Sequence, residues 1–563
     1  MATGTLSWLC VAFVICLGWV VCDDREERIV RIEQGPVRGY KEKGDSIFTF
    51  YGIPYASAPT GKDKFKAPLP GPAWLSVLDA VNREITCPQA TIYGTTFPGT
   101  VQENCLVANI YVPETSKKNL PVVVYVHGGG YQVGSGILRE PKNLVRTKNV
   151  IAVTFNYRLG IYGFLCLGTN EAPGNAGMKD QVALLRWVKK NIASYGGNPE
   201  DVTIAGYSAG SSAVDLLVLS PLAKDLFNKV IPESGANLAP WSVQIDPLEN
   251  AKLFAKSKGF KDVDDVYALE EFYTSASMDL LISTGGFFDR TDVSFVFTPC
   301  VEQKTSKAAF LTDSPYNIVK SGKYNKVPML YGFADMEGLL RIAQFDSWKD
   351  KINANFSAFL PVDLKFDSEK EREEVSNKVK KFYFGDKPVS QDNILAYIDF
   401  MSDVYFGYSS LKAVKLYAGS GNNKVYLYEY NFVDNSAPAI PYTDNVKGAT
   451  HCAQTLAVLD GIDFMSQDTD ETDISEEYKK MKSVVREIWI NFITTGTPVP
   501  LGSSLPTWPA VGADGAPHMA LGRELQLRGA LIEERVRFWD TVYERHYRVP
   551  QPPPQPPTRH TEL

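Results

Sequence analysis

Histidine is scarce in this chain, with five residues among 563, so few positions can supply the imidazole that most often serves as a general base. Basic residues are also too few to suggest a polyanion as partner. The 58 Lys and Arg residues are outnumbered by 65 Asp and Glu residues, and the net charge of −7 is spread along the chain. This balance leaves no basic footprint for nucleic acid. No internal repeat is evident.

Long apolar runs are missing after the first 22 residues, so no later segment should span a bilayer. The one such run, Leu6 to Cys22, ends abruptly at an acidic and basic cluster, Asp23 to Glu27. This pattern predicts a cleaved secretory signal peptide over residues 1–22, with a short membrane anchor as the alternative. On a secretory route, the N-glycosylation sequon Asn355-Phe-Ser357 would be a substrate for modification.

Cysteine is sparse as well, and its count is odd once the signal peptide is removed. Of the eight cysteines, Cys10, Cys16 and Cys22 leave with the signal. Cys87 and Cys105 are nearest in sequence and bracket a Gly/Thr/Pro-rich loop, so they are the predicted disulfide. Spacing does not assign the remaining three, of which at least one stays a free thiol. They are Cys166, Cys300 and Cys452.

The motif Gly206-Tyr-Ser-Ala-Gly210 lies between an apolar run that predicts a strand, Val202 to Ala205, and a segment that reads as a helix, Ser211 to Leu219. This is the context of a nucleophile elbow, in which a sharp turn exposes the serine hydroxyl. The two glycines remove Cβ atoms that such a turn cannot hold. The alternative is a chance cluster of small residues.

A glycine-rich loop, His127-Gly-Gly-Gly130, follows the apolar strand predicted for Pro121 to Val126. Backbone N–H groups in such a loop can approach a ligand, as in the oxyanion loops of lipases and esterases. A simple glycine turn is the alternative. A helix at Ala183 to Ala193 separates a predicted strand, Val150 to Asn156, from the elbow strand. This alternation predicts a parallel sheet with reactive side chains beyond its carboxyl ends.

The second half of the chain continues the same alternation. Val327 to Leu330 and Val425 to Phe432 are predicted strands, and Phe333 to Gly338 a loop. Helices are predicted at Ser483 to Ile493 and Leu531 to His546. The tail, Pro550 to Pro557, can form neither helix nor sheet and should be an extended polyproline spacer before His560-Thr-Glu-Leu563.

Taken together, these stretches resemble the carboxylesterase/cholinesterase family of α/β-hydrolases, the type-B carboxylesterases, and look most like insect carboxylesterases. The resemblance runs from about Ile32 to Tyr543 and implies an α/β-hydrolase domain, residues 23–548, with a large, mostly parallel central sheet flanked by helices. The family usually has Asp where Asn104 stands. The matching blocks are Phe50-Tyr-Gly-Ile-Pro-Tyr-Ala56, Glu103-Asn-Cys-Leu106, Asn156-Tyr-Arg-Leu-Gly160, Asp180-Gln181, Tyr195-Gly-Gly-Asn-Pro199 and Ser234-Gly235.

By this resemblance, Ser208, Glu337 and His451 form a catalytic triad, in the chain order expected for the fold. Gly448-Ala-Thr-His451 matches the family's G-x-x-H. Elimination supports His451, because the other histidines lie in the glycine loop, a turn, the last helix and the tail. Glu337-Gly338 matches the family's Glu-Gly, and Asp335 is the rival acid. The residues after His451, Cys452-Ala-Gln, depart from the family pattern. The resemblance therefore does not assign the residues that form the floor of the pocket.

The resemblance further implies an oxyanion hole made of the backbone N–H groups of Gly129, Gly130 and Ala209. Trp241 and Tyr131 would narrow the acyl pocket, with a plain core position as the alternative for Trp241. Tyr207 stands where cholinesterases have Glu, and the loop from Cys87 to Cys105 has no Trp to stack on choline. The expected substrates are therefore small uncharged carboxylic esters, and the chemistry needs no metal or cofactor.

Two other functions fit the same fold. A non-catalytic adhesion relative would lack triad members and usually add a membrane anchor, whereas this chain keeps all three residues. A neutral lipase would differ mainly in its lid and substrate size.

The last four residues differ from a His-Asp-Glu-Leu retention signal at one position. They predict residence in the endoplasmic reticulum lumen through a retention receptor. The alternatives are secretion and a chance match.

Overall fold

The structure is a computed structural model that describes residues 25–91, 99–284, 289–304, 308–461 and 474–558. The predicted signal peptide and the terminal His560-Thr-Glu-Leu563 lie outside these ranges. Within the described part of the chain, no helix is both long and apolar enough to cross a membrane.

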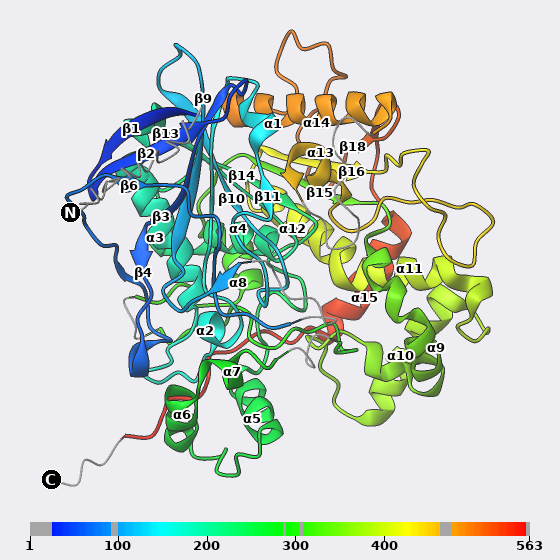
Figure 1. The fold of residues 1–563 in the computed structure, drawn as a ribbon. Helices are drawn as coiled ribbons and strands as arrows, with labels where there is room; N and C mark the ends of the chain where they lie inside the picture. Colours follow the sequence, from blue (N-terminus) through cyan, green and yellow to red (C-terminus); the bar gives the residue numbers. More distant parts are fainter. Residues whose placement is uncertain (1–24, 92–98, 285–288, 305–307, 462–473, 559–563) are drawn as a thin grey trace, which may run out of the picture.

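A large twisted sheet crosses the molecule, with strand order β1-β2-β3-β9-β12-β10-β13-β14-β15-β16-β18-β19, and β6 (Leu78–Asp79) pairs with β2 (Figure 1). Its central pairs, from β12 to β18, are parallel, and both edges are antiparallel. The parallel strands are β10 (Leu120–Val126), β12 (Ile151–Phe155), β13 (Gly197–Tyr207), β14 (Lys229–Glu233), β15 (Met329–Ala334), β16 (Val425–Tyr430) and β18 (His518–Leu521). The antiparallel strands are β1 (Glu26–Ile32), β2 (Gly35–Lys41), β3 (Ile47–Pro54), β9 (Val107–Pro113) and β19 (Leu525–Arg528).

Helices cover both faces of this sheet, which explains why its central strands read as continuous apolar runs. On β10, Val122 and Val124 belong to the same core as α3 (Ala176–Asn191) and α4 (Ala209–Leu219). Val123 and Tyr125 point the other way, into the core formed with α14 (Glu476–Thr495) and α13 (Ala453–Val458). The predicted α/β-hydrolase architecture, a large and centrally parallel sheet flanked by helices, is confirmed.

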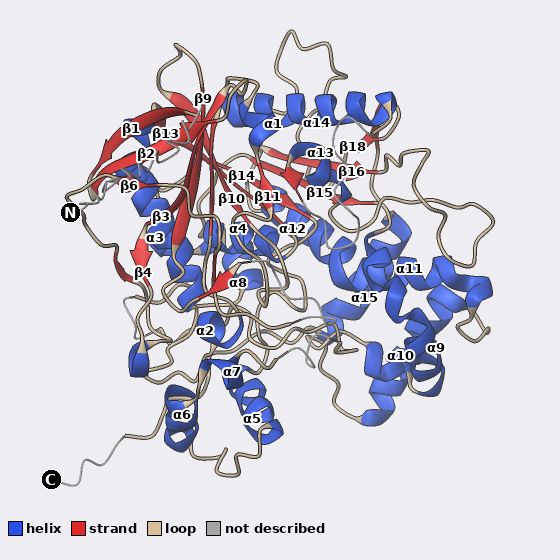
Figure 2. Cartoon of the chain, viewed as in Figure 1, coloured by secondary structure: helices blue, strands red, loops and turns tan. Residues whose placement is uncertain are grey.

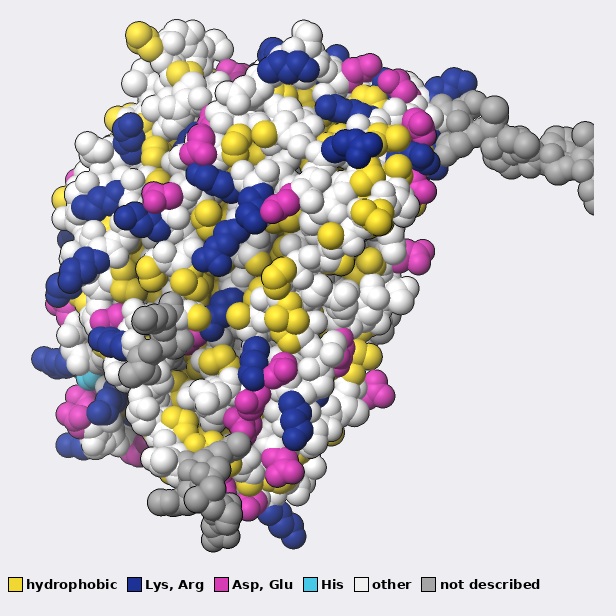
Figure 3. All heavy atoms as spheres, turned by 90° about the vertical axis from the view of Figure 1, so that its left-hand side faces the viewer, with side chains coloured by type: hydrophobic (Ala, Val, Ile, Leu, Met, Phe, Trp, Pro, Cys, Tyr) yellow, Lys and Arg dark blue, Asp and Glu magenta, His cyan; other side chains and the backbone are white. Residues whose placement is uncertain are grey.

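A second group of helices, α9 (Phe345–Ala354), α10 (Glu369–Phe384) and α11 (Ile394–Ser402), gathers to one side of the sheet (Figure 2). Between α11 and α12 (Tyr408–Gly419), one turn of π-helix spans Asp403–Gly407. The opposite side of the molecule, which presents the β1–β2 edge, carries basic, acidic and hydrophobic side chains interspersed (Figure 3).

Two local predictions need correction. The segment Phe333 to Gly338 is not a loop throughout, because β15 continues to Ala334 and a 3₁₀ helix begins at Glu337. The proline-rich tail has no helix or strand, as expected, but it is not a free spacer. Pro553 is buried, and Pro557 O accepts a 2.6 Å hydrogen bond from Tyr267 Oη of α6 (Val266–Ser275). In Figure 1 the red segment after α15 (Glu533–His546) runs along the body to α6.

Candidate active site

Ser208 occupies the sharp turn between β13 and α4. Its φ of 55° and ψ of −124° lie outside the regions that L-residues favour. Backbone hydrogen bonds hold the turn on both sides. The Ser208 N–H donates to Glu233 O at 2.8 Å, and Ser208 O accepts from the Ser212 N–H at 3.1 Å. The strained geometry expected of a nucleophile elbow is therefore present.

The two glycines around Ser208 are required by close backbone contacts. A Cβ on Gly206 would lie 2.4 Å from Gly210 O, and a Cβ on Gly210 would lie 2.1 Å from Val126 O. Both contacts are with backbone atoms, which cannot swing aside as a side chain can. The G-x-S-x-G pattern thus follows from the packing of the elbow against the end of β10.

Glu337 and His451 are joined by a hydrogen bond of 2.5 Å between Glu337 Oε2 and His451 Nδ1. The other carboxylate oxygen, Oε1, accepts from Ser234 Oγ at 2.5 Å and from the Ala334 N–H at 2.8 Å. The Glu337 side chain is fully buried, whereas 9% of the His451 side chain is exposed. Phe406 stacks on the imidazole with ring centroids 4.2 Å apart. The ring is therefore oriented from its edge and from its face.

Asp335, the alternative candidate for the acid, does not bind the His451 imidazole. It binds the backbone of the loop that precedes His451. Its Oδ1 accepts the Ala449 N–H at 2.9 Å, and the Met336 N–H donates to Ala449 O at 3.1 Å. Burial raises the pKa of Asp335 to about 7. The structure thus places Glu337 against the imidazole of His451, and Asp335 against the loop that precedes His451.

The glycine loop after β10 lies against Ser208, since a Cβ on Gly128 would be 3.0 Å from Ser208 Cβ. Gly129, Gly130 and Tyr131 follow one another with φ values of 105°, 62° and 62°. In the part of the chain that the structure describes, the N–H groups of Gly129, Gly130 and Ala209 donate to no protein acceptor. Successive N–H groups left open in such a turn form an anion-binding concavity.

His127 is a support of this loop. Burial lowers its pKa to about 4, so the imidazole is neutral at neutral pH. Its Nδ1 lies 2.9 Å from Gly128 O, and the ring stacks on Tyr157 at 4.4 Å. Because a peptide group is planar, fixing Gly128 O also fixes the Gly129 N–H. Sequence reasoning placed His127 in the loop without assigning it this contact.

The predicted pocket residues Trp241 and Tyr131 are both buried. Trp241 Nε1 donates to Tyr405 O at 2.8 Å, and its ring lies 5.8 Å from Phe406, the ring that stacks on His451. Tyr131 Oη donates to Ser212 Oγ at 2.8 Å. Trp241 is thus a core residue, and Phe406 lies between its ring and the His451 imidazole.

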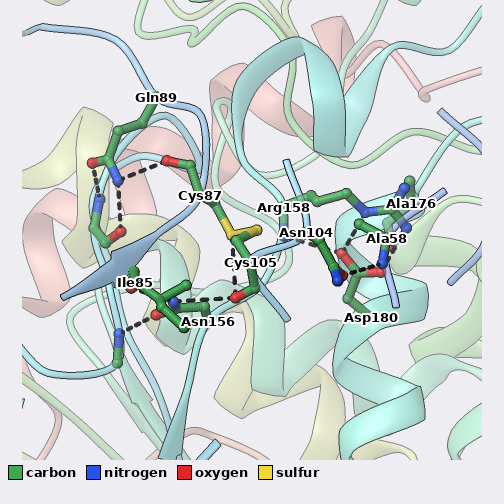
Figure 4. Close-up of a disulfide and its surroundings, with 12 residues drawn as sticks. Ala58, Ile85, Cys87, Gln89, Asn104, Cys105, Asn156, Arg158, Ala176 and Asp180 are labelled. Atoms are coloured by element: carbon green, nitrogen blue, oxygen red, sulfur yellow. Dashed lines mark hydrogen bonds and ion pairs between the residues drawn. A yellow bond between two sulfur atoms is a disulfide. The ribbon is translucent and has the colours of Figure 1, made fainter. Parts of the chain in front are cut away.

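The disulfide predicted between Cys87 and Cys105 is present and is connected to the glycine loop (Figure 4). Gln89 Nε2 donates to Cys87 O and to Gly134 O, both at 3.1 Å, and the Gly134 N–H donates to Gln89 Oε1 at 2.9 Å. Asn156 Nδ2 donates to Cys105 O at 3.2 Å. The bridge therefore fixes the segment that follows the candidate oxyanion loop.

Two further family blocks meet beside this bridge (Figure 4). Arg158 binds Asp180 through two hydrogen bonds, Nε to Oδ2 at 2.8 Å and Nη2 to Oδ1 at 2.6 Å, in a fully buried pair. Asn104 Oδ1 accepts the Ala58 N–H at 3.1 Å. An Asp carboxylate at this position could accept the same bond, so this contact does not require the amide of Asn104.

A second disulfide, Cys166–Cys300, was not assigned from the sequence. Its cysteines are 134 positions apart, so spacing gave no signal beyond the odd count. The fifth cysteine, Cys452, is a buried thiol next to His451. Asn355, the predicted glycosylation site, is exposed, and its Oδ1 accepts from Ser357 Oγ at 2.7 Å.

The family model described as "Carboxylesterase family" matches residues 26–539. The chain belongs to the carboxylesterase family. It is a carboxylic ester hydrolase, and the family implies small-molecule ester substrates.

Several similar proteins are insect esterases. This esterase is 32% identical to esterase FE4 of Myzus persicae over 86% of its own length and 87% of that protein. It is also 32% identical to juvenile hormone esterase of Heliothis virescens, over 89% and 92% of the two chains. The solved juvenile hormone esterase of Manduca sexta, with OTFP covalently attached, superposes with a TM-score of 0.81 at 29% identity, covering 92% of this chain and all of that one. The predicted likeness to insect carboxylesterases is confirmed.

Proposed function

We propose that this esterase cleaves uncharged carboxylic esters through an acyl-enzyme on Ser208. The observation that carries the proposal is the 2.5 Å contact between Glu337 and His451, taken together with the strained backbone of Ser208 at the elbow. Ser208, Glu337 and the glycine loop each follow the carboxyl end of a parallel strand, where open α/β sheets place their sites.

In the first half-reaction, His451 Nε2 accepts the Ser208 proton as Oγ attacks the ester carbonyl carbon. The tetrahedral oxyanion is bound by the N–H groups of Gly129, Gly130 and Ala209. When this intermediate collapses, the C–O bond to the alcohol breaks, and His451 returns the proton to the departing alkoxide. Water then repeats the sequence on the acyl-enzyme and releases the carboxylic acid. Glu337 orients the ring and stabilises the imidazolium that forms in both steps.

The preference for uncharged esters is supported by the surroundings of Tyr207. This residue is buried, and the guanidinium of Arg139 lies 5.0 Å from the centre of its ring. A ring face already occupied by a cation does not provide a cation–π site for a choline group. Acetylcholine should therefore be hydrolysed far more slowly than an aryl ester with the same acyl group.

The experiment that tests the mechanism is covalent labelling with an organophosphate, followed by peptide mass spectrometry. Wild-type enzyme should be labelled at Ser208 and should lose activity in proportion to the fraction labelled. Ser208→Ala should take up no label. Ser211→Ala, in the first turn of α4, is the matched control and should still be labelled at Ser208. Activity of Ser208→Ala equal to wild type, with label elsewhere, would overturn the mechanism. Turnover of emulsified triglyceride but not of short aryl esters would favour a lipase.

We also propose that the enzyme resides in the endoplasmic reticulum lumen, held by a retention receptor that reads His560-Thr-Glu-Leu563. Support comes from the tail, because Pro557 and Thr558 are exposed at the surface where the docked segment leaves the body. The signal peptide over residues 1–22 and a glycan on Asn355 belong to the same proposal. Secretion of the intact protein in full would contradict it.

A further inference from the structure

Residues 293–302, here called the wall segment, pack against Trp241, which is one of the two predicted acyl-pocket residues. Phe295 lies 5.7 Å from Trp241, ring centre to ring centre. Val293 and Phe297 both have a φ of 60°, which is unfavourable for a β-branched and for a bulky residue. The segment therefore holds a backbone conformation that its surroundings must enforce.

The far end of this wall segment is anchored covalently and by charge. Cys300 is bonded to Cys166. Glu302 Oε1 lies 2.5 Å from Lys179 Nζ, and its Oε2 accepts from Asn175 Nδ2 at 2.7 Å. All of these side chains are buried. Any adjustment of the wall must therefore take place nearer to Phe295 and Phe297.

At that near end, the wall segment is tied to the glycine loop by one side chain, Gln132. Its Nε2 donates to Val296 O at 2.6 Å and to Phe297 O at 2.9 Å, and lies 3.4 Å from Gly130 O. The amide has two N–H donors and is buried. Both of its donors are thus committed to carbonyls of the wall and the loop.

The backbone of Gln132 also contacts the glycine loop. The Gln132 N–H donates to Gly129 O at 2.9 Å, and the Val133 N–H donates to the same oxygen at 3.1 Å. Because the peptide group is planar, the orientation of Gly129 O sets the direction of the Gly130 N–H. His127 holds the preceding peptide group in the same way, through Gly128 O.

We propose that Gln132 is a positioning residue that couples the oxyanion donor Gly130 to the acyl-pocket wall at Phe295. The inference rests on the proposed acyl-enzyme mechanism and deepens it. With Gln132 in place, the site that stabilises the oxyanion and the surface that receives the acyl chain keep a fixed relative position. The rate with an acetyl ester should depend only on the oxyanion site. The rate with a longer acyl chain should depend on both the oxyanion site and the wall segment.

The test is Gln132→Met, which keeps the length and volume of the side chain and removes both N–H donors. With active sites counted by organophosphate titration, kcat for p-nitrophenyl acetate should fall roughly 10-fold, less than the ~10²–10³ that follows loss of an oxyanion donor. The loss in kcat/KM should grow from acetate to butyrate to octanoate. The inhibition constant of a trifluoromethyl ketone, whose adduct carries an oxyanion, should rise as kcat falls.

Gln89→Met is the matched control, because Gln89 is also a buried amide bonded to this loop, at Gly134. It should lower thermal stability without changing the ratio of rates across acyl lengths. If Gln132→Met does not fold, Gln132→Asn keeps the amide but shortens its reach and should show the same graded loss. An equal loss on every ester, with an unchanged ketone inhibition constant, would overturn the proposal. Failure of wild type to label at Ser208 would instead refute the underlying mechanism.

Discussion

Replacing Glu337 with Gln changes a single atom at the acid, and the contacts of Glu337 determine how the new amide must sit. The Ser234 hydroxyl and the Ala334 N–H both donate to Oε1, at 2.5 and 2.8 Å, so the amide oxygen must take that position. The NH₂ group then faces His451 Nδ1, where Oε2 accepts at 2.5 Å in the wild type. Two donors cannot share this contact. His451 must therefore present an unprotonated Nδ1 and carry its proton on Nε2.

In that tautomer His451 cannot accept the Ser208 proton, which is the first step of the proposed mechanism. The equivalent exchange of acid for amide in a serine protease triad lowers kcat about 10⁴-fold while leaving the geometry intact. We expect a loss of that order for Glu337→Gln on p-nitrophenyl acetate, with KM changed little. Burst kinetics should show slow acylation, which locates the defect at the first chemical step.

Asp335→Asn provides the matched control. Asn Oδ1 can still accept the Ala449 N–H that Asp335 holds at 2.9 Å, so kcat should stay within a few-fold of wild type. The assignment of Glu337 as the acid would be refuted if Glu337→Gln kept activity within ten-fold of wild type. The same conclusion would follow if Asp335→Asn alone lost the ~10⁴-fold.

Other predictions concern stability, processing and location. Replacing Cys166 and Cys300 with Ala should lower the free energy of unfolding by about 5 kcal/mol, which is the chain-entropy value for cysteines separated by 134 residues. An unchanged denaturation midpoint would contradict this prediction. Burial raises the pKa of Asp363 from 3.8 to about 7, so the folded protein retains a proton that the unfolded chain loses as the pH rises through this window. Stability should therefore fall from pH 4 to 7, and Asp363→Asn should make that fall less steep in denaturant titrations; an equally steep fall would refute the assignment. Removing residues 560–563 should move the enzyme from cells to medium at unchanged specific activity, and continued retention would refute the signal. Asn355→Gln should abolish the mass shift that an N-glycosidase produces, and a persisting shift would place the glycan elsewhere.

The centre of the fold could be predicted because buried parallel strands are apolar on both faces. The runs ending at Val126 and Ala205 lie within β10 and β13. The glycine loop begins directly after β10, and Ser208 is the first residue after β13. Chain order and the family resemblance then named Glu337 and His451, which the structure brings into contact.

The features that were missed depend on contacts between distant parts of the chain. β15 continues through Phe333 and Ala334 because these residues pair with Glu429 and Tyr430 of β16, nearly a hundred positions away. The role of Gln132 appears only when residues 296 and 297 lie beside it. Local propensity carries no information on such contacts, because they arise from the tertiary arrangement.

The two disulfides also differ in the time at which they can form during synthesis. Cys87 and Cys105 leave the ribosome 18 residues apart, so their bridge can close almost at once in an oxidising compartment. Cys166 must wait for a partner 134 residues later, which at about 5–20 residues per second takes roughly 7–27 s. During that interval the unpaired Cys166 thiol is open to exchange with other thiols. A bridge that closes early therefore protects the later one, since it removes the two cysteines that could compete for Cys166.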